Sequence, residues 1–223
     1  MSAAYLSLLL ADGRLPTGAH TQSAGVEPAL RTGMSLAEVP DYLSVRLRTV
    51  TETEAGTAVL ARAAFLAGEP GLRVAPLAVL DQAWRARTPS DALRDAADLL
   101  GRSYLRMAAT VWDLHELTAA GRTWCRAVVI GATAAVAGLA AAETARLVAF
   151  EDVQTVLAAA LKLVPFDPSR GVAWAVAAEP EVERLVQAVS GLASVDELPA
   201  HSAPLIEQWG QIHRDSERRL FRA

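Results

Sequence analysis

The stretch "TPSDALRDAADLLGRSYLRMAATVW", residues 88–112, sets the expectation for the whole fold because it carries every local signal of a helix. Thr88 is placed to cap the helix, Pro89 suits its first turn, and Asp91 complements the positive end of the helix dipole. Arg94 and Asp98 have the spacing of a surface ion pair. Apolar residues recur every three or four positions at Leu93, Ala96, Ala97, Leu100, Tyr104, Met107 and Val111. The stretch is therefore predicted to be an amphipathic helix.

The same helical pattern recurs along most of the chain. "AAYLSLLL" begins a helix that we expect to be buried, Ser35 and Glu38 form a capping box ahead of a helical pattern over 35–55, and the next helix should stop at Gly68. Further helices are expected over 123–142, 150–164, 170–178, 180–190 and from 204 onward. No convincing alternating strand, internal repeat or domain-splitting linker is found. The sequence predicts an all-α, single-domain bundle of about eight to ten helices over residues 1–223.

Composition and charge exclude several classes of partner. Hydrophobic residues make up 52% of the chain and aromatic ones 5%, so the core must consist mainly of Ala, Val and Leu. The net charge of −4 argues against nucleic acid. The only cysteine, Cys125, rules out an intrachain disulfide and fits a reducing compartment. No signal peptide is recognised, and the longest uncharged run, 127–142, is shorter than the roughly 20 residues that cross a bilayer. We expect a cytoplasmic protein without membrane contact.

The motifs of common enzymes and metal sites are missing. The single lysine, Lys162, follows Leu161, so there is no P-loop, and neither a dinucleotide fingerprint nor a serine-hydrolase elbow occurs. The four histidines are scattered, which predicts no stable metal site and no cofactor. His20 is the best single candidate for a transient ligand, although a loop histidine bonded to the backbone is the favoured interpretation. No catalytic residue is predicted.

The segment "ADGRLPTGAHTQSAGVE", residues 11–27, interrupts the helical pattern with Gly, Pro and polar side chains. Such a loop turns the chain, binds a partner, or does both. Glu27 and Arg31 lie four residues apart on the helix expected after the loop, and we interpret them as a solvated ion pair.

Two features near the C-terminal side leave alternatives open. Lys162 in "LAAALKLVPF" either extends along the apolar surface to reach solvent or presents its charge to a partner. Leu220 and Phe221 lie in an Arg-rich chain end, where they either anchor an interface or fold back onto the core of their own chain.

Three segments together resemble UreF-type urease accessory proteins. "LLLADGRLPTGAHTQSAGVE", "LKLVPF" and "RRLF" have the order and relative spacing of motifs in that family, and "LRDAADLLGRSYLRM" is similar to its middle helix. The resemblance implies an all-α, non-enzymatic cytoplasmic protein that acts as a homodimer. It implies a complex with UreD (also called UreH) and the nickel-carrying GTPase UreG, which couples GTP turnover to nickel delivery into the urease apoprotein. Nickel would pass through that complex without a stable site on this chain.

The resemblance also assigns roles to particular residues. The opening loop is expected to face the GTPase, Lys162 to couple to it, and a tail over about 213–223 to pack against UreD. The partner-binding residues implied in this way are Leu15, Pro16, Gly18, His20, Ser23, Gly25, Glu27, Lys162, His213, Arg219, Leu220 and Phe221.

Two departures from the family pattern, "DPSRG" at 167–171 and Arg214 after His213, leave contacts there open. Two other functions remain as alternatives. One is a helical enzyme or ligand-binding bundle with a pocket near His20, Glu27 and His213, and the other is a helical adaptor unrelated to urease.

Overall fold

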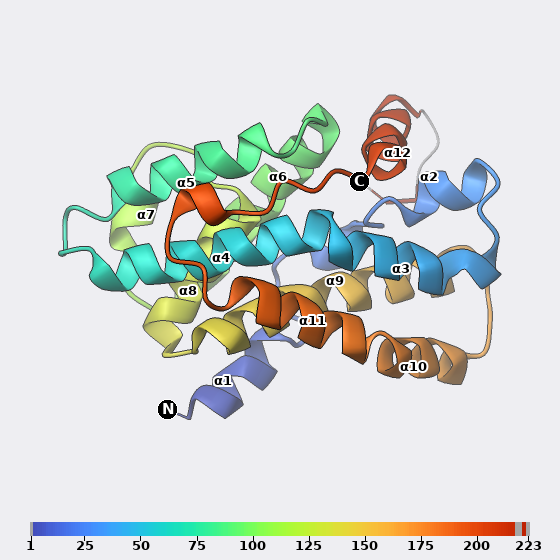
Figure 1. The fold of residues 1–223 in the computed structure, drawn as a ribbon, viewed down its shortest axis with the longest axis horizontal. Coiled ribbons are helices and arrows are strands. Elements are labelled where there is room, and N and C mark those ends of the chain that lie inside the picture. The colour runs from blue at the N-terminus through green and yellow to red at the C-terminus, as the bar shows by residue number, and fades with distance from the viewer. Residues whose placement is uncertain (1, 217–219, 222–223) are drawn as a thin grey trace.

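The computed structural model describes residues 2–216 and 220–221, and every regular element in them is a helix (Figure 1). The α-helices are α1 (Ala3–Leu10), α2 (Val26–Arg31), α3 (Val39–Arg48), α4 (Val50–Ala67), α5 (Val74–Ala86), α6 (Asp91–Ala108), α7 (His115–Ala119), α8 (Arg126–Ala137), α9 (Ala141–Leu163), α10 (Pro168–Ala177), α11 (Glu179–Val189) and α12 (Pro204–Asp215). Short 3₁₀ turns lie at η1 (Ala19–Thr21), η2 (Leu36–Glu38) and η3 (Val195–Glu197). Apart from the very short α2 and α7, ten α-helices are seen in the described residues, and the predicted all-α bundle is confirmed.

Helix α4 is the centre of the bundle and is surrounded by α3, α5, α8, α9 and α11 (Figure 1). Small side chains make this possible. At the crossing with α8, a Cβ atom on Gly131 would overlap the carbonyl oxygen of Ala58 and press on the Ala61 side chain. The low aromatic content of the sequence thus corresponds to helices that approach closely.

The apolar core is continuous from α1 to the tail, since the buried cluster includes Leu6 and Phe221. In Figure 1, α2 and α12 lie at the same end of the molecule, where the described chain also ends. Within the described residues, none of the helices combines the length and apolar character that a membrane crossing needs.

Helix boundaries follow the sequence signals in the segment that begins at Ser35, with one exception. The capping box is present, with the Ser35 amide donating to Glu38 Oε2 at 2.8 Å. The pattern over 35–55 is not one helix, because Thr49 adopts φ −130° and ψ −94° and separates α3 from α4. As predicted, α4 ends at Gly68.

The start of α6 differs from the prediction. Ser90 rather than Thr88 is the N-cap, and its hydroxyl accepts from the Leu93 amide at 3.3 Å. The Thr88 hydroxyl instead donates to the carbonyl oxygen of Trp84 at 3.1 Å, at the end of α5. Thr88 was the wrong cap because the preceding helix already uses its hydroxyl.

The ion pair predicted between Arg94 and Asp98 is also absent from the contacts observed. Arg94 pairs with Asp91, and Asp98 accepts from Arg85 of α5 at 2.5 Å. Because α5 packs against α6, Asp98 pairs with Arg85 of the neighbouring helix and not with Arg94, the partner that helical spacing predicts.

Helix α1 is only half buried, contrary to the expectation for "AAYLSLLL". Leu6 and Leu10 face the core, whereas Tyr5 and Leu8 are exposed.

Candidate functional site

Four segments that are distant in sequence meet beside the C-terminal half of α9. They are the opening loop, α2, Lys162 of α9, and the chain end at Leu220 and Phe221. The Lys162 ammonium donates to the carbonyl oxygen of His20 at 3.4 Å and lies 5.4 Å from the centroid of the Phe221 ring. The second contact has the geometry of a cation–π interaction. We call this group of segments the composite surface.

A buried carboxylate holds the chain end in place. Glu27 Oε1 accepts from the Leu220 amide at 2.8 Å, and Oε2 accepts from the Phe221 amide at 2.9 Å. His213 Nε2 lies 3.1 Å from the carbonyl oxygen of Phe221. The side chains of Glu27 and His213 are 1% and 2% exposed, respectively. One charged group thus binds two consecutive amides in a site shielded from water, where such hydrogen bonds are strong.

The interpretation of Glu27 and Arg31 as a solvated ion pair is therefore correct for the pair but wrong for the Glu27 carboxylate, which is not solvated. Arg31 Nε lies 3.8 Å from Glu27 Oε1, but the Glu27 carboxylate is buried beneath the chain end and bonded to it. Helical spacing gave no sign of this, because the amides that Glu27 binds are 193 and 194 residues away.

The shape of the opening loop depends on Ala24 and Gly25. Gly25 precedes α2 with φ +83°, and a Cβ there would lie 2.6 Å from the Tyr42 hydroxyl. That hydroxyl donates to the carbonyl oxygen of Ala24, which also accepts from Arg46 Nη1 at 2.9 Å. Helix α3 therefore fixes the loop, and only glycine tolerates both the backbone angle and the approach of Tyr42.

The structure divides the predicted site residues into exposed and buried groups. Exposed side chains available to a partner are those of Pro16, His20, Lys162 and Leu220, and the residues that support them from within are Ser23, Gly25, Glu27, His213 and Phe221. Leu15 and Gly18 are half-buried. Arg219 lies outside the described residues. Of the two alternatives for the chain end, Phe221 folds back onto its own chain while Leu220 points outward.

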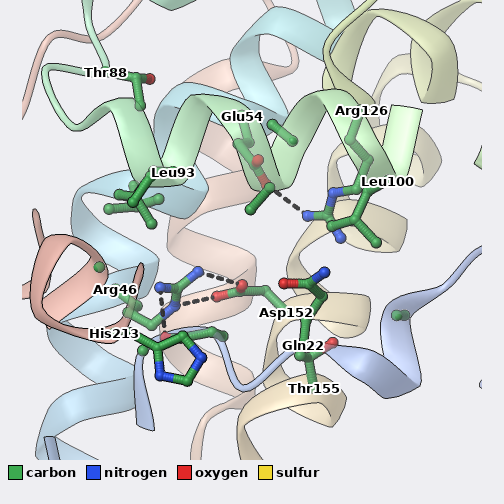
Figure 2. Close-up of a pocket in the computed structure, with 18 of the residues that line it drawn as sticks. Gln22, Arg46, Glu54, Thr88, Leu93, Leu100, Arg126, Asp152, Thr155 and His213 are labelled. Atoms are coloured by element: carbon green, nitrogen blue, oxygen red, sulfur yellow. Dashed lines mark hydrogen bonds and ion pairs between the residues drawn. The ribbon is translucent and has the colours of Figure 1, made fainter. Parts of the chain in front are cut away.

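A cavity whose mainly apolar lining includes several charged side chains lies next to the composite surface, inside the bundle (Figure 2). Arg46 of α3 and Asp152 of α9 form a buried two-point ion pair, with Nε–Oδ2 and Nη2–Oδ1 distances of 2.9 and 2.6 Å. Thr51 donates to the same carboxylate at 2.7 Å. Burial alone would raise the pKa of Asp152, but the charge and hydrogen bonds of Arg46 outweigh it and hold the pKa below its usual value.

A second buried group joins α4, α8 and α9. Arg126 Nη2 lies 2.5 Å from Glu54, and Arg126 Nη1 lies 3.7 Å from Glu151. Burial raises the pKa of Glu151 to about 7, Arg126 opposes the rise, and the charges of Glu54 and Asp152 add to it. Glu151 therefore changes charge near neutral pH.

The cavity and a surface pocket share a wall. Gln22 and Thr155 line both, and the outer pocket also includes His20, Glu151 and Lys162. The inner cavity has a volume of about 80 Å³, enough for several water molecules. Among the residues that the structure describes, three buried side-chain donors have no hydrogen-bond partner: Gln22 Nε2, Tyr104 Oη and Arg126 Nε.

Sequence reasoning missed this polar interior. The signal was available, because Arg46, Glu54, Arg126 and Asp152 interrupt apolar faces of their helices. Spacing does not pair residues on different helices, however, so each charge alone resembled a surface residue. No three His, Cys, Asp or Glu side chains of residues 2–216 and 220–221 are grouped so that they could hold a metal ion.

Comparison with known proteins places the chain among relatives of similar length. A model of the UreF family matches residues 35–179. The chain belongs to the UreF family. The urease accessory protein UreF of Mycobacterium sp. (strain JLS) is 35% identical over 217 residues, which cover 96% of each chain. UreF proteins of Mycolicibacterium vanbaalenii and Mycobacterium tuberculosis (strain H37Rv) are 34% and 32% identical, and each alignment covers 99% of both chains.

UreF membership confirms the resemblance inferred from the three motifs. The family model does not reach the opening loop or the tail, but the alignments with whole UreF chains extend across nearly all of both sequences. The composite surface therefore lies within the length that this chain shares with UreF proteins.

Proposed function

We propose that this chain is a non-enzymatic scaffold in urease maturation. In this proposal it binds UreD (UreH) and the GTPase UreG, and it couples GTP turnover by UreG to the transfer of nickel into the urease apoprotein. Nickel is the cargo of the complex and has no resident site on this chain.

The observation that carries the proposal is the composite surface itself. His20, Lys162 and Leu220 are exposed side by side, although they come from the two ends of the chain and from α9. Their supports, Glu27 and Phe221, are buried. A buried base beneath a few exposed side chains suits recognition of another protein, because little backbone freedom needs to be lost on binding.

The test is co-elution of the full chain with UreD and UreG from the same host, measured by size-exclusion chromatography with light scattering. Lys162→Ala should remove UreG from the complex and retain UreD, whereas Leu220→Ala should weaken the hold on UreD. Arg146→Ala is the matched control, since Arg146 is an exposed cation in the N-terminal part of the same helix, α9. Failure of the unmodified chain to form a complex under any nucleotide and nickel condition would refute the scaffold.

The homodimer is proposed to form through α9 and α10. Leu161, Val164, Val172 and Val176 are exposed there, and an apolar groove between the two helices is lined by Leu161 and Phe166. A contiguous exposed apolar area of this kind is typical of a contact surface. Val172→Asp combined with Val176→Asp should convert a dimer to a monomer in light scattering, and an unchanged mass would place the dimer contact elsewhere.

The alternative of a small-molecule pocket formed by His20, Glu27 and His213 is disfavoured by the same geometry. The chain end occupies Glu27 and His213, and His20 contributes only its carbonyl oxygen to the Lys162 contact.

A further inference from the structure

The seat of the chain end has the features of a peptide-binding site. Its polar contacts with the two described residues of the chain end go to main-chain atoms: the amides of Leu220 and Phe221 and the carbonyl oxygen of Phe221. The side chain of Phe221 is buried and lies under the Lys162 ammonium, while the side chain of Leu220 is 65% exposed. The site therefore recognises a bent backbone with two amides on one side and one aromatic ring, and it makes little contact with the Leu220 side chain.

A tethered segment needs little intrinsic affinity to remain bound, because a short covalent connection supplies an effective concentration of roughly millimolar. Leu220 follows the end of α12 by five residues. The tail is thus held by its tether as well as by its contacts, and such an arrangement allows exchange with a free peptide.

We propose that the pocket formed by Glu27, His213 and Lys162 is an exchangeable peptide-binding site. Its ligand is a bent segment with two consecutive amides that point to the same side and an aromatic residue at the second position. The occupant in this structure is Leu220–Phe221 of the same chain. The inference does not depend on which proteins bind the composite surface, so it can fail while the scaffold function stands.

Release of the segment has a defined consequence. Phe221 is part of the wall of the outer pocket that also contains His20 and Lys162. An empty seat therefore leaves the Glu27 carboxylate without its two amide donors and opens that pocket on one side.

The main test uses full-length protein and a fluorescent peptide of residues 214–223, RDSERRLFRA, with binding read by polarisation. The Phe221→Ala chain should bind the peptide at least about tenfold more tightly than the unmodified chain, whose own tail competes for the seat. The Leu66→Ala chain is the matched control, since Leu66 is an exposed apolar residue of α4 outside the seat. Because its Phe221 remains seated, it should bind the peptide as weakly as the unmodified chain.

The hydrogen bonds are tested on the peptide, which avoids any effect on folding. Methylation of the two nitrogens at the Leu220 and Phe221 positions removes both donors, and it should weaken binding to the Phe221→Ala chain by roughly tenfold or more. Equal affinity of the methylated peptide would overturn the proposal. So would equal peptide affinity of the Phe221→Ala and unmodified chains.

Hydrogen exchange on the unmodified chain gives a readout that needs no added peptide. The amides of Leu220 and Phe221 should be protected, and Glu27→Gln should speed their exchange at least about tenfold. Glu69→Gln, in an exposed turn, should leave it unchanged. Unprotected amides in the unmodified chain would overturn the proposal.

Discussion

The sharpest prediction about stability concerns Glu151, the carboxylate between the inner cavity and the outer pocket. The ion pair between Glu151 and Arg126 is long, at 3.7 Å, whereas Arg126 lies only 2.5 Å from the carboxylate of Glu54. Burial therefore outweighs the attraction and raises the pKa of Glu151 from 4.5 to about 7. Replacing Glu151 with Gln removes the charge and keeps nearly the same shape.

The folded chain binds the Glu151 proton more tightly than the unfolded chain does. The stability contributed by this proton is fully present below pH 4.5, and it is lost as pH rises through about 7. Each pKa unit corresponds to about 1.36 kcal/mol, so the raised pKa of Glu151 lowers the free energy of unfolding by about 3 kcal/mol across this pH interval. This is an upper value, since 13% of the side chain is exposed. At pH 8, Glu151→Gln should stabilise the protein by about 2 to 3 kcal/mol.

Urea unfolding at pH 4.5 and pH 8 measures the effect, provided that unfolding is reversible. At pH 4.5 the free energy of unfolding of Glu151→Gln should be almost that of the unmodified chain. At pH 8 it should be higher, and in thermal unfolding this difference should raise the melting temperature by roughly 5 to 10 °C. Glu69→Gln, an exposed glutamate, should behave like the unmodified chain at both pH values. If Glu151→Gln changes the free energy of unfolding equally at both, then the carboxylate does not titrate near neutrality and the account of the buried cluster is incorrect.

Three further substitutions test the packing and the surface. Gly131→Ala should lower the free energy of unfolding by about 1 to 3 kcal/mol, because its Cβ would overlap the carbonyl oxygen of Ala58; a neutral result in thermal unfolding would contradict the close α4–α8 crossing. Asp152→Asn should cost about 3 to 5 kcal/mol in urea unfolding, since Arg46 would be left as a buried charge without its partner, and a cost below about 1 kcal/mol would argue against the pair. Lys162→Ala should change stability by no more than about 0.5 kcal/mol in the same assay; a larger loss would mean that the lysine is structural rather than available to a partner.

Much of the local structure was predictable because its causes are local. The capping box at Ser35, the stop at Gly68 and the apolar periodicity of α6 each depend on residues within a few positions of one another. The errors arose where a neighbouring element intervened. Thr88 was bonded to the preceding helix, and Asp98 was paired with Arg85.

The candidate site was predicted as a set of residues but not as an arrangement. Resemblance assigned the opening loop and Lys162 to one partner and the chain end to another, and the structure brings the described members of both sets together. The structure also shows which of these residues are exposed, such as Lys162, and which are buried supports, such as Glu27. The proposed variants are chosen on this distinction.

The sequence alone determined that the chain is helical, where most helices begin and end, and which family its motifs resemble. It could do so because periodicity, caps and motifs depend on residues that are close together in the sequence. Only the tertiary structure decided that Glu27 binds the amides of Leu220 and Phe221, and that Arg46 and Asp152 neutralise each other inside the bundle. The physical reason is that a buried charge must find a partner, and which partner lies within reach depends on how the helices cross.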